Sequence, residues 1–359
     1  MKQHRLDAVL GKLQEKNITQ MLISDPVAIL YLTGKYIDPD ERFYGLYVNT
    51  KGDCRWFVNN MFSVEEDPEV ERVGFSDTDD YMSLLLQSID KGKTLGVDKN
   101  LPAKFLVPIL KQASADNIVI TSSCIDEVRA IKDAEEIQRM RESSQINDRA
   151  MGEFRKLLQS GVTEIEVANQ MLDIYSKLGA QSFSFEPTVS FGTNTADNHH
   201  NPDNTPLKEG DVVMLDVGCR KDWYCSDMTR MFFYRKEPTD FQRQIYQLAR
   251  RATETAESVC RPGITMAEID LTARRIISDQ GYGPNFLHRT GHFIGLEDHD
   301  YGDVSSTNMY KAVPGNIFSI EPSITLDGQF NMTVEDLVLI TEEGHEVLNQ
   351  YSHEIDVVE

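Results

Sequence analysis

The sequence predicts two domains: an α/β domain at the N-terminus and an α+β domain that contains an internal pseudo-two-fold repeat. Three observations support this division. A chain of 359 residues is long enough to form two hydrophobic cores. Strand-like and helix-like segments alternate through the first third of the chain, which is typical of an α/β domain. In the remainder, several sequence features recur at a nearly constant offset, which indicates two similar halves.

The N-terminal segment alternates in the order helix, strand, helix, hairpin, and then helix and strand twice. Apolar residues at helical spacing predict an amphipathic helix over residues 6–13. Residues 26–34 predict a helical turn that ends at a glycine. The remaining predicted strands are 21–23, 43–48, 54–58, 94–97 and 118–120, and the remaining helices are 81–89 and 103–112. Strands 43–48 and 54–58 form the hairpin. Few titratable residues cluster here, so we expect no catalysis from this segment alone.

A change of pattern marks the domain boundary. Residues 125–159 are charged and helical, with apolar residues along one face. We place the boundary between Thr121 and Lys132. On this basis, residues 1–125 form the first domain and residues 126–359 form the second.

The second domain contains a repeated helix-opening motif, the capping box, in which a threonine and a glutamate three residues later bond to each other's backbone amides. The motif at 163–166 recurs at 265–268, an offset of 102 residues. The predicted helices end at Gly179 and Gly281, which have the same offset. A long helix precedes each copy, at 133–159 and 240–259, and the strand-like segments 210–216 and 315–321 also match. This repeat predicts two similar halves that face a shared centre.

Four acidic residues interrupt or border apolar segments that we predict to be buried strands. Asp216 lies inside one segment and Asp227 directly precedes the next, whereas Glu321 follows a third and Glu335 opens a fourth. The first two segments are residues 212–217 and 228–233. An unpaired carboxylate in an apolar interior costs several kcal/mol. Four of them therefore predict a shared cation, which we take to be a pair of metal ions.

Composition excludes several classes of partner. The formal net charge of −22 argues against a nucleic-acid partner and against adhesion to an anionic membrane. The N-terminus lacks the apolar segment of a signal peptide, and no long apolar run predicts a transmembrane helix. Five cysteines, without a C-x-x-C pair, fit reduced thiols better than disulfides. We therefore expect a cytoplasmic protein.

Histidines cluster near these acids in the sequence. His288, His292 and His299 fall close together, and His199 and His200 form a pair after a polar loop. A lone histidine is more often a satisfied structural residue than a ligand. A cluster that accompanies four buried acids favours a functional site.

Five short motifs resemble the metal-ligand motifs of the proline peptidases. This family comprises Xaa-Pro dipeptidase (prolidase) and Xaa-Pro aminopeptidase (aminopeptidase P), and it is related to methionine aminopeptidase. In chain order the motifs are LDVG at 215–218, SDMTR at 226–230, GHFIGL at 291–296, IEP at 320–322 and VED at 334–336. The segment YLTG at 31–34 is similar to part of the family's N-terminal domain. One motif is weak evidence, but the ordered set is specific. The resemblance implies a pita-bread catalytic fold, in agreement with the repeat.

The resemblance also implies the metal ligands. By similarity, Asp216 holds one ion, His292 and Glu321 hold the other, and Asp227 and Glu335 bridge the two. Four carboxylates and a neutral imidazole carry four negative charges, which balance two divalent ions. Oxygen ligands with one imidazole suit Mn²⁺, the ion that we expect, and also Co²⁺ or Zn²⁺. Two ions about 3.5–4 Å apart share a water molecule, lower its pKa and deliver hydroxide to a peptide carbonyl.

The implied function is hydrolysis of the N-terminal Xaa-Pro bond in dipeptides or short peptides, by a homodimer. Glu321 is the expected general base. His199, His288 and His299 are expected to surround the substrate, with His199 or His299 stabilising the tetrahedral oxyanion or the amide nitrogen. We choose His199 over His200 as the first histidine of the pair. The alternative for His288 is a hydrogen-bonded packing residue.

The sequence departs from the family pattern at several positions. Thr333 stands where the family usually has an arginine, and Ser323 stands where it has a glycine. The residues after His299 favour aminopeptidase P, whereas the short chain favours the dipeptidase. Two alternatives stay open: a metallopeptidase of the same fold with non-prolyl specificity, and a non-catalytic peptide-binding protein. The complete ligand set argues against the latter and against a creatinase-like enzyme that works without metal.

Overall fold

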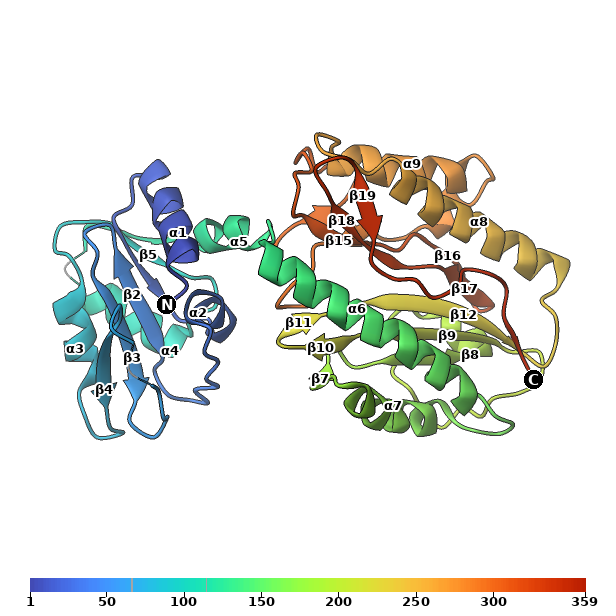
Figure 1. The fold of residues 1–359 in the computed structure, drawn as a ribbon, viewed down its shortest axis with the longest axis horizontal. Coiled ribbons are helices and arrows are strands. Elements are labelled where there is room, and N and C mark those ends of the chain that lie inside the picture. The colour runs from blue at the N-terminus through green and yellow to red at the C-terminus, as the bar shows by residue number, and fades with distance from the viewer. Residues whose placement is uncertain (66, 114) are drawn as a thin grey trace. The chain divides into compact units, whose positions relative to one another are not determined.

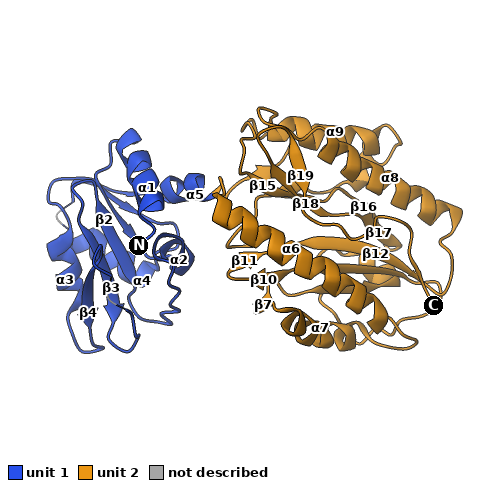
Figure 2. Ribbon diagram, in the orientation of Figure 1, with its two compact units in different colours: residues 1–129 blue, residues 130–359 orange. Residues whose placement is uncertain are grey.

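The structure, a computed structural model, describes residues 1–65, 67–113 and 115–359 and divides into two compact units. Met1–Arg129 forms the first unit and Ala130–Glu359 forms the second (Figure 2). None of the helices among the described residues combines the length and the apolar character needed to span a bilayer. All five cysteines are free and buried.

The first unit is an α/β domain built on a six-stranded mixed sheet, as predicted. The strand order is β4-β3-β2-β1-β5-β6, and β1 runs parallel to β5 but antiparallel to β2. The strands are β1 (Gln20–Ile23), β2 (Gly45–Asn49), β3 (Cys54–Asn59), β4 (Glu71–Phe75), β5 (Leu95–Val97) and β6 (Ile118–Ile120). The helices are α1 (Gln3–Glu15), α2 (Pro26–Thr33), α3 (Tyr81–Ser88), α4 (Ala103–Gln112) and α5 (Ser123–Arg129).

The predicted hairpin is present as β2 and β3, which pair antiparallel. Helix α2 ends at Gly34, whose φ of +75° is the left-handed conformation that glycine adopts easily. The sequence pattern did not indicate β4, because only Phe75 of its residues is buried and the segment has no apolar alternation. The first unit thus has the predicted class and one additional edge strand.

The second unit is an α+β domain in which two pairs of helices pack with several small sheets (Figure 1). Helix α6 (Ala134–Phe154) packs against α7 (Glu164–Leu178), and α8 (Asp240–Ser258) packs against α9 (Met266–Ser278). The sheet orders are β20-β12-β9-β8, β15-β18-β19, β11-β10-β7, β16-β17 and β13-β14. The longer strands are β8 (Thr188–Phe191), β9 (Val212–Val217), β12 (Met228–Tyr234), β15 (Ile317–Ile320), β16 (Ser323–Leu326), β17 (Phe330–Thr333) and β18 (Asp336–Ile340). The short strands are β7 (Ser182–Phe183), β10 (Cys219–Lys221), β11 (Tyr224–Cys225), β13 (Gly291–His292), β14 (Asp303–Val304), β19 (His345–Val347) and β20 (Val357–Val358).

The charged stretch at 125–159 forms two helices rather than one continuous helix. Helix α5 ends at Arg129, and α6 begins after Asp133, which forms a capping box with Glu136. Between the helices, the Lys132 amide donates to the Gly315 carbonyl oxygen at 2.8 Å. Because this backbone bond and the cap satisfy polar groups locally, the interruption is a stable feature of the chain.

The internal repeat is present in three dimensions. Both capping boxes form, and the residue before each capping threonine makes an equivalent backbone bond: Leu207 donates to Val162, and Ala312 donates to Ile264, each at 2.8 Å. Strand β9 pairs antiparallel with β12, and β15 pairs antiparallel with β18 in the same way. Helix α7 ends at Gly179 as predicted, whereas α9 ends at Ser278, three residues before Gly281.

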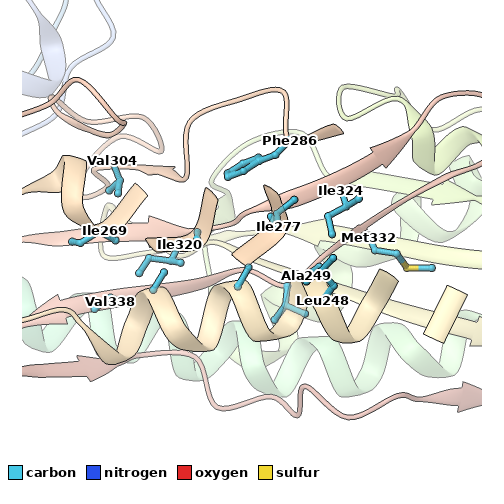
Figure 3. Packing of buried hydrophobic residues seen from close by; sticks show 14 of the residues in the cluster. Leu248, Ala249, Ile269, Ile277, Phe286, Val304, Ile320, Ile324, Met332 and Val338 are labelled. Carbon is cyan, nitrogen blue, oxygen red and sulfur yellow. The ribbon is translucent and has the colours of Figure 1, made fainter. Parts of the chain in front are cut away.

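One large apolar core supports the C-terminal half of the second unit (Figure 3). Side chains from α8 and α9 meet side chains from the strands that carry the acids. The residues labelled in Figure 3 are Leu248, Ala249, Ile269, Ile277, Phe286, Val304, Ile320, Ile324, Met332 and Val338. Burial of one such large side chain stabilises the fold by about 1.5–3 kcal/mol. Since Ile320 belongs to this core, the next residue, Glu321, leaves a rigid strand end.

Candidate metal centre

A cavity of about 670 Å³ in the second unit brings the candidate site residues together. All five predicted metal ligands and all three predicted substrate histidines line it. The site residues at the cavity are Asp216, Asp227, His292, Glu321, Glu335, His199, His288 and His299. His200, Arg289, Asp298 and Glu186 also line it. Residues separated by more than a hundred positions in the chain therefore share one cavity.

Strand ends place the four acids. Asp216 lies within β9, opposite Thr229 of β12, and Asp227 directly precedes β12. Glu321 follows the last residue of β15, and Glu335 lies between β17 and β18. Three of the four acids therefore lie at strand ends, where a chain leaving a sheet aims side chains into open space. Asp216 alone lies within a strand, as the sequence predicted.

His292 lies among the acids as a neutral imidazole. Burial lowers its pKa to about 3, and its Nδ1 lies 3.3 Å from the carbonyl oxygen of Phe293, which leaves Nε2 for an ion. Nε2 lies 3.5 Å from Oδ2 of Asp227 and 3.5 Å from Oε1 of Glu321. Two atoms that bind one ion at about 2.1 Å each lie at most about 4.2 Å apart. Both distances therefore fit a shared ion.

The electrostatics of the acids also fit divalent cations. Burial and then the charge of Asp298 raise the pKa of Asp216 to about 7, and burial and then the charge of Asp216 raise that of Glu321 to about 8. Burial raises the pKa of Asp227 and Glu335 well above their ordinary values. One oxygen of Asp227 is buried and has no hydrogen-bond partner in the described part of the chain. Oxygen donors packed this closely are the ligand set of a divalent metal.

Neighbouring hydroxyl groups orient the acids. Thr229 Oγ1 donates to Oε2 of Glu335 at 2.6 Å, and Ser319 Oγ donates to Oε1 of Glu321 at 3.1 Å. Arg230 is almost fully buried and donates to the carbonyl oxygen of Glu335 at 2.7 Å. Hydrogen bonds of this kind hold a ligand in its binding orientation before the ion arrives. Ligands Asp227, His292 and Glu335 each offer an atom within 4.8 Å of the others.

The two histidines of the 199–200 pair have different environments. His200 Nε2 lies 2.7 Å from Oε2 of Glu164, a fully buried carboxylate at the start of α7. His199 is exposed, lines the cavity and has no such partner for its ring among the described residues. This difference supports the choice of His199 as the histidine that meets a substrate.

Both ring nitrogens of His288 bond to the protein. Nδ1 lies 2.7 Å from the carbonyl oxygen of Arg289, which only accepts, so Nδ1 carries the hydrogen. Nε2 lies 2.7 Å from Ser323 Oγ. Burial lowers the pKa of His288, which favours the neutral ring, and Nε2 then accepts from the serine hydroxyl. His288 therefore presents a ring face to the cavity rather than a free donor.

The two departures from the family pattern face each other. Ser323 of β16 pairs with Thr333 of β17 across the strands, and both are buried. Thr333 Oγ1 donates to the Pro322 carbonyl oxygen at 3.3 Å, directly after Glu321. Small hydroxyl side chains therefore occupy a place beside a metal ligand where the family usually has an arginine and a glycine.

His299 is exposed and lies against His292. The ring centroids are 4.1 Å apart at an interplanar angle of 83°. His299 Nε2 is 3.8 Å from Oδ2 of Asp298. Asp298, a carboxylate at the cavity besides the four predicted ligand acids, is a residue that the sequence reasoning missed. Its position directly before a candidate histidine was the one available signal.

A second missed feature is an ion pair on α9 that holds the segment before His292. Arg274 and Asp270 form two hydrogen bonds at 2.9 Å each. Arg274 also donates to the His288 carbonyl oxygen at 2.8 Å, and Asp270 accepts from the Thr290 amide and hydroxyl. The spacing of an acid and an arginine four residues apart on a predicted helix was visible, but it is common on solvated helix faces.

The fold and the site define a two-domain protein whose second domain carries a candidate carboxylate–histidine metal site in a cavity. The chain belongs to metallopeptidase family M24. The model of that family matches residues 138–342, and the model of the creatinase/prolidase N-terminal domain matches residues 5–131. An uncharacterized peptidase of Staphylococcus aureus strain USA300 is 33% identical over 351 residues, which cover 97% of this chain and 99% of the relative.

Solved structures share the fold over nearly the whole chain. A prolidase from Thermococcus sibiricus is 28% identical with a TM-score of 0.91, covering 99% of both chains. An Xaa-Pro dipeptidase from Bacillus anthracis is 25% identical with a TM-score of 0.92, covering 99% of this chain and 100% of the other. An X-Pro aminopeptidase from Thermotoga maritima is 25% identical with a TM-score of 0.84, covering 97% and 100%. The predicted family and the pita-bread fold are confirmed.

Proposed function

We propose that this metallopeptidase removes the N-terminal residue from peptides whose second residue is proline, with a dinuclear metal centre. One observation carries the proposal: four buried carboxylates and a neutral imidazole converge on one cavity beside further histidines. The likeness to a prolidase, an Xaa-Pro dipeptidase and an X-Pro aminopeptidase supports the choice of substrate.

We propose that the five candidate ligands at the cavity divide between two ions as the family resemblance implies. Asp216 would hold one ion, His292 and Glu321 the other, and Asp227 and Glu335 both ions. We propose Mn²⁺, with Co²⁺ or Zn²⁺ as alternatives, because the ligand set is mostly oxygen with one imidazole. Bound ions of this kind lower the pKa of water and polarise a peptide carbonyl.

The remaining catalytic roles belong to side chains at the cavity. Glu321 is the proposed general base, because its carboxylate follows the end of β15 and lines the cavity beside His292. His199 and His299, whose rings face the cavity, are placed to donate to the developing oxyanion or to the leaving amide nitrogen. His288 contributes a ring wall, because Ser323 and the Arg289 carbonyl occupy its nitrogens.

A second candidate is a metallopeptidase of the same site with non-prolyl specificity. The hydroxyl pair Ser323 and Thr333 beside Glu321 favours this alternative, since it removes a positive charge and a long side chain from the family pattern. A non-catalytic peptide-binding role has no such support, because no predicted ligand is missing from the cavity.

Metal analysis and a substrate panel test the proposal. The purified protein should contain two transition-metal ions per chain by elemental analysis. With added Mn²⁺, hydrolysis of Ala-Pro alone identifies a dipeptidase, and hydrolysis of both Ala-Pro and Ala-Pro-Ala identifies an aminopeptidase. Hydrolysis of Ala-Ala in preference to both supports the non-prolyl candidate. A metal-loaded protein that cleaves none of the three peptides would exclude the proposed activity.

Two further properties complete the proposal. The free, buried thiols support a reducing compartment such as the cytoplasm. We also propose a homodimer, as the family resemblance implied, and light scattering at several protein concentrations measures that state directly.

A further inference from the structure

Asp298 is a cavity carboxylate that the proposed metal centre does not use. It lines the same cavity as the five ligands, and its side chain is 20% exposed. Oδ1 of Asp298 is shielded from water and has no hydrogen-bond partner among the described residues. A buried carboxylate oxygen without a donor is costly, so a donor supplied by a bound ligand would stabilise it.

The proposed metal centre is already electrically neutral without Asp298. Four ligand carboxylates and the neutral His292 already balance two divalent ions. Asp298 is a further carboxyl group beside these ligands, and its side chain contacts that of Asp227. The complete site therefore attracts one more positive charge.

The protein itself supplies little of that charge. The ion-pair contact of Asp298 within the described chain is with His299 Nε2 at 3.8 Å, which is longer than a hydrogen bond. Arg220 lies near but donates to the Leu296 and Ser184 carbonyl oxygens at 3.0 and 3.5 Å. Arg289 also lines the cavity, but its charge acts on Glu321 and His292 and is not among the groups that act on Asp298. A cationic group of a ligand can therefore pair with Asp298.

We propose that Asp298 binds the α-ammonium group of the substrate's N-terminal residue. This inference rests on the proposed exopeptidase function, in which a free N-terminus enters the cavity. The ammonium group has three donors, and one of them can pair with the unpartnered Oδ1 of Asp298. Asp298 is therefore the residue that distinguishes a free N-terminus from a blocked one.

The consequence is a preference that depends on charge rather than on shape. L-Lactyl-proline differs from Ala-Pro in carrying a hydroxyl group where the ammonium stands. The wild-type protein should prefer Ala-Pro by about 10- to 100-fold in kcat/KM, the range expected for one hydrogen bond to a charged group. Asp298→Asn keeps the size of the side chain, removes its charge and should reduce this ratio to near one.

Further measurements accompany the ratio of kcat/KM for Ala-Pro to that for L-lactyl-proline. Elemental analysis should find the same metal content in Asp298→Asn as in the wild type. Glu186→Gln, which changes an exposed carboxylate at the same cavity, should keep the wild-type ratio, because water screens that charge. Direct binding of the ketomethylene isostere of Ala-Pro, and of its analogue with hydroxyl in place of ammonium, gives the same comparison without turnover.

Each outcome decides the proposal. A wild-type ratio in Asp298→Asn would overturn it, and so would a loss of metal, which would make Asp298 a ligand instead. If Asp298→Asn does not fold, Asp298→Ala is judged by the same ratio and metal content. If the wild type hydrolyses neither substrate, the proposed function fails, but isostere binding still tests Asp298: equal binding of the two analogues by the wild type would overturn the inference.

Discussion

Oε2 of Glu164 lies 2.7 Å from Nε2 of His200, and this contact anchors the loop that carries His199. The Glu164 carboxylate is fully buried and also accepts from the Phe191 and Asp203 amides at 2.7 and 3.2 Å. Asn194 Nδ2 is its fourth donor, at 3.0 Å. A carboxylate has acceptors only, which matches four donors. The two adjacent histidines therefore have different roles. His200 holds the loop in place, and His199 faces the cavity.

We predict that Glu164→Gln destabilises the protein. The glutamine NH₂ group is a hydrogen-bond donor, and it would point at groups that themselves donate to the Glu164 carboxylate. At least one buried donor then loses its acceptor, which costs about 1–3 kcal/mol in the free energy of unfolding. Chemical denaturation measures the loss. Glu166→Gln on the same helix is the matched control, since Glu166 is exposed and glutamine also forms a capping box. Equal stability of the two variants would contradict the anchoring role.

Asp227→Asn should lower kcat by several orders of magnitude while the fold survives. In the proposed centre Asp227 binds both ions, so the variant would lose a ligand charge at the cavity. The free energy of unfolding of the metal-free variant should not fall, because the substitution removes one of several repelling buried carboxylates. Steady-state rates, elemental analysis and thermal denaturation check the three parts. Near wild-type rates would remove Asp227 from the metal centre, and Asp173→Asn on the exposed side of α7 controls for surface charge.

Metal removal should make stability depend on pH with a definite sign. Without ions, the folded-state pKa is about 7 for Asp216 and about 8 for Glu321, against ordinary values of 3.8 and 4.5. The unfolded chain releases these protons first, so the free energy of unfolding falls as pH rises from about 4 toward 8. Mn²⁺ replaces the protons and should remove this decline, adding about 2.7 kcal/mol at a concentration 100 times Kd.

Thermal denaturation of chelator-treated protein at pH 5 and pH 8, with and without Mn²⁺, makes this comparison. The gain in Tm from Mn²⁺ should be larger at pH 8 than at pH 5. A metal-free protein that is more stable at pH 8 than at pH 5 would show that other groups dominate the titration.

The sequence alone predicted those parts of the site that interrupt a regular sequence pattern. Asp216 stands out because it lies inside an apolar strand, and the repeat was detectable because capping boxes have a fixed spacing. Both signals are local. The pairing of β9 with β12, and of β15 with β18, then places acids from distant segments at one cavity.

Other parts of the site have no local signal. Asp298 lies in an irregular segment, and its importance comes from Asp216 and Asp227, which are more than 70 positions away. Strands such as β11 and β13 have two residues each, too few to show an alternating pattern. His288 lines the cavity, but its bond to Ser323 depends on a tertiary contact between segments 35 residues apart.

Glu257 on α8 gives a further test, away from the metal ligands. Its side chain is buried, and burial followed by the charge of Asp336 raises its pKa to about 9 from 4.5. The unfolded chain ionises this group above about pH 4.5, whereas the folded protein keeps the proton up to about pH 9, so the wild type loses stability across that range. Glu257→Gln cannot ionise, and its amide can still donate to Asp336. Its advantage over the wild type should therefore grow between pH 5 and pH 9, by at most about 1.4 kcal/mol per pH unit.

Glu254, one turn earlier on the same helix, provides a control with the opposite sign. Burial alone would raise its pKa, but hydrogen bonds from Arg250 and His353 outweigh burial and lower it. Stability from this group is present above its ordinary pKa of 4.5 and is lost as pH falls through the lowered folded-state value. Glu254→Gln should thus be less stable than the wild type at pH 7 and should approach it in acid. Urea denaturation of both variants from pH 4 to pH 9 measures the two trends, and parallel trends would contradict the assigned protonation of Glu257.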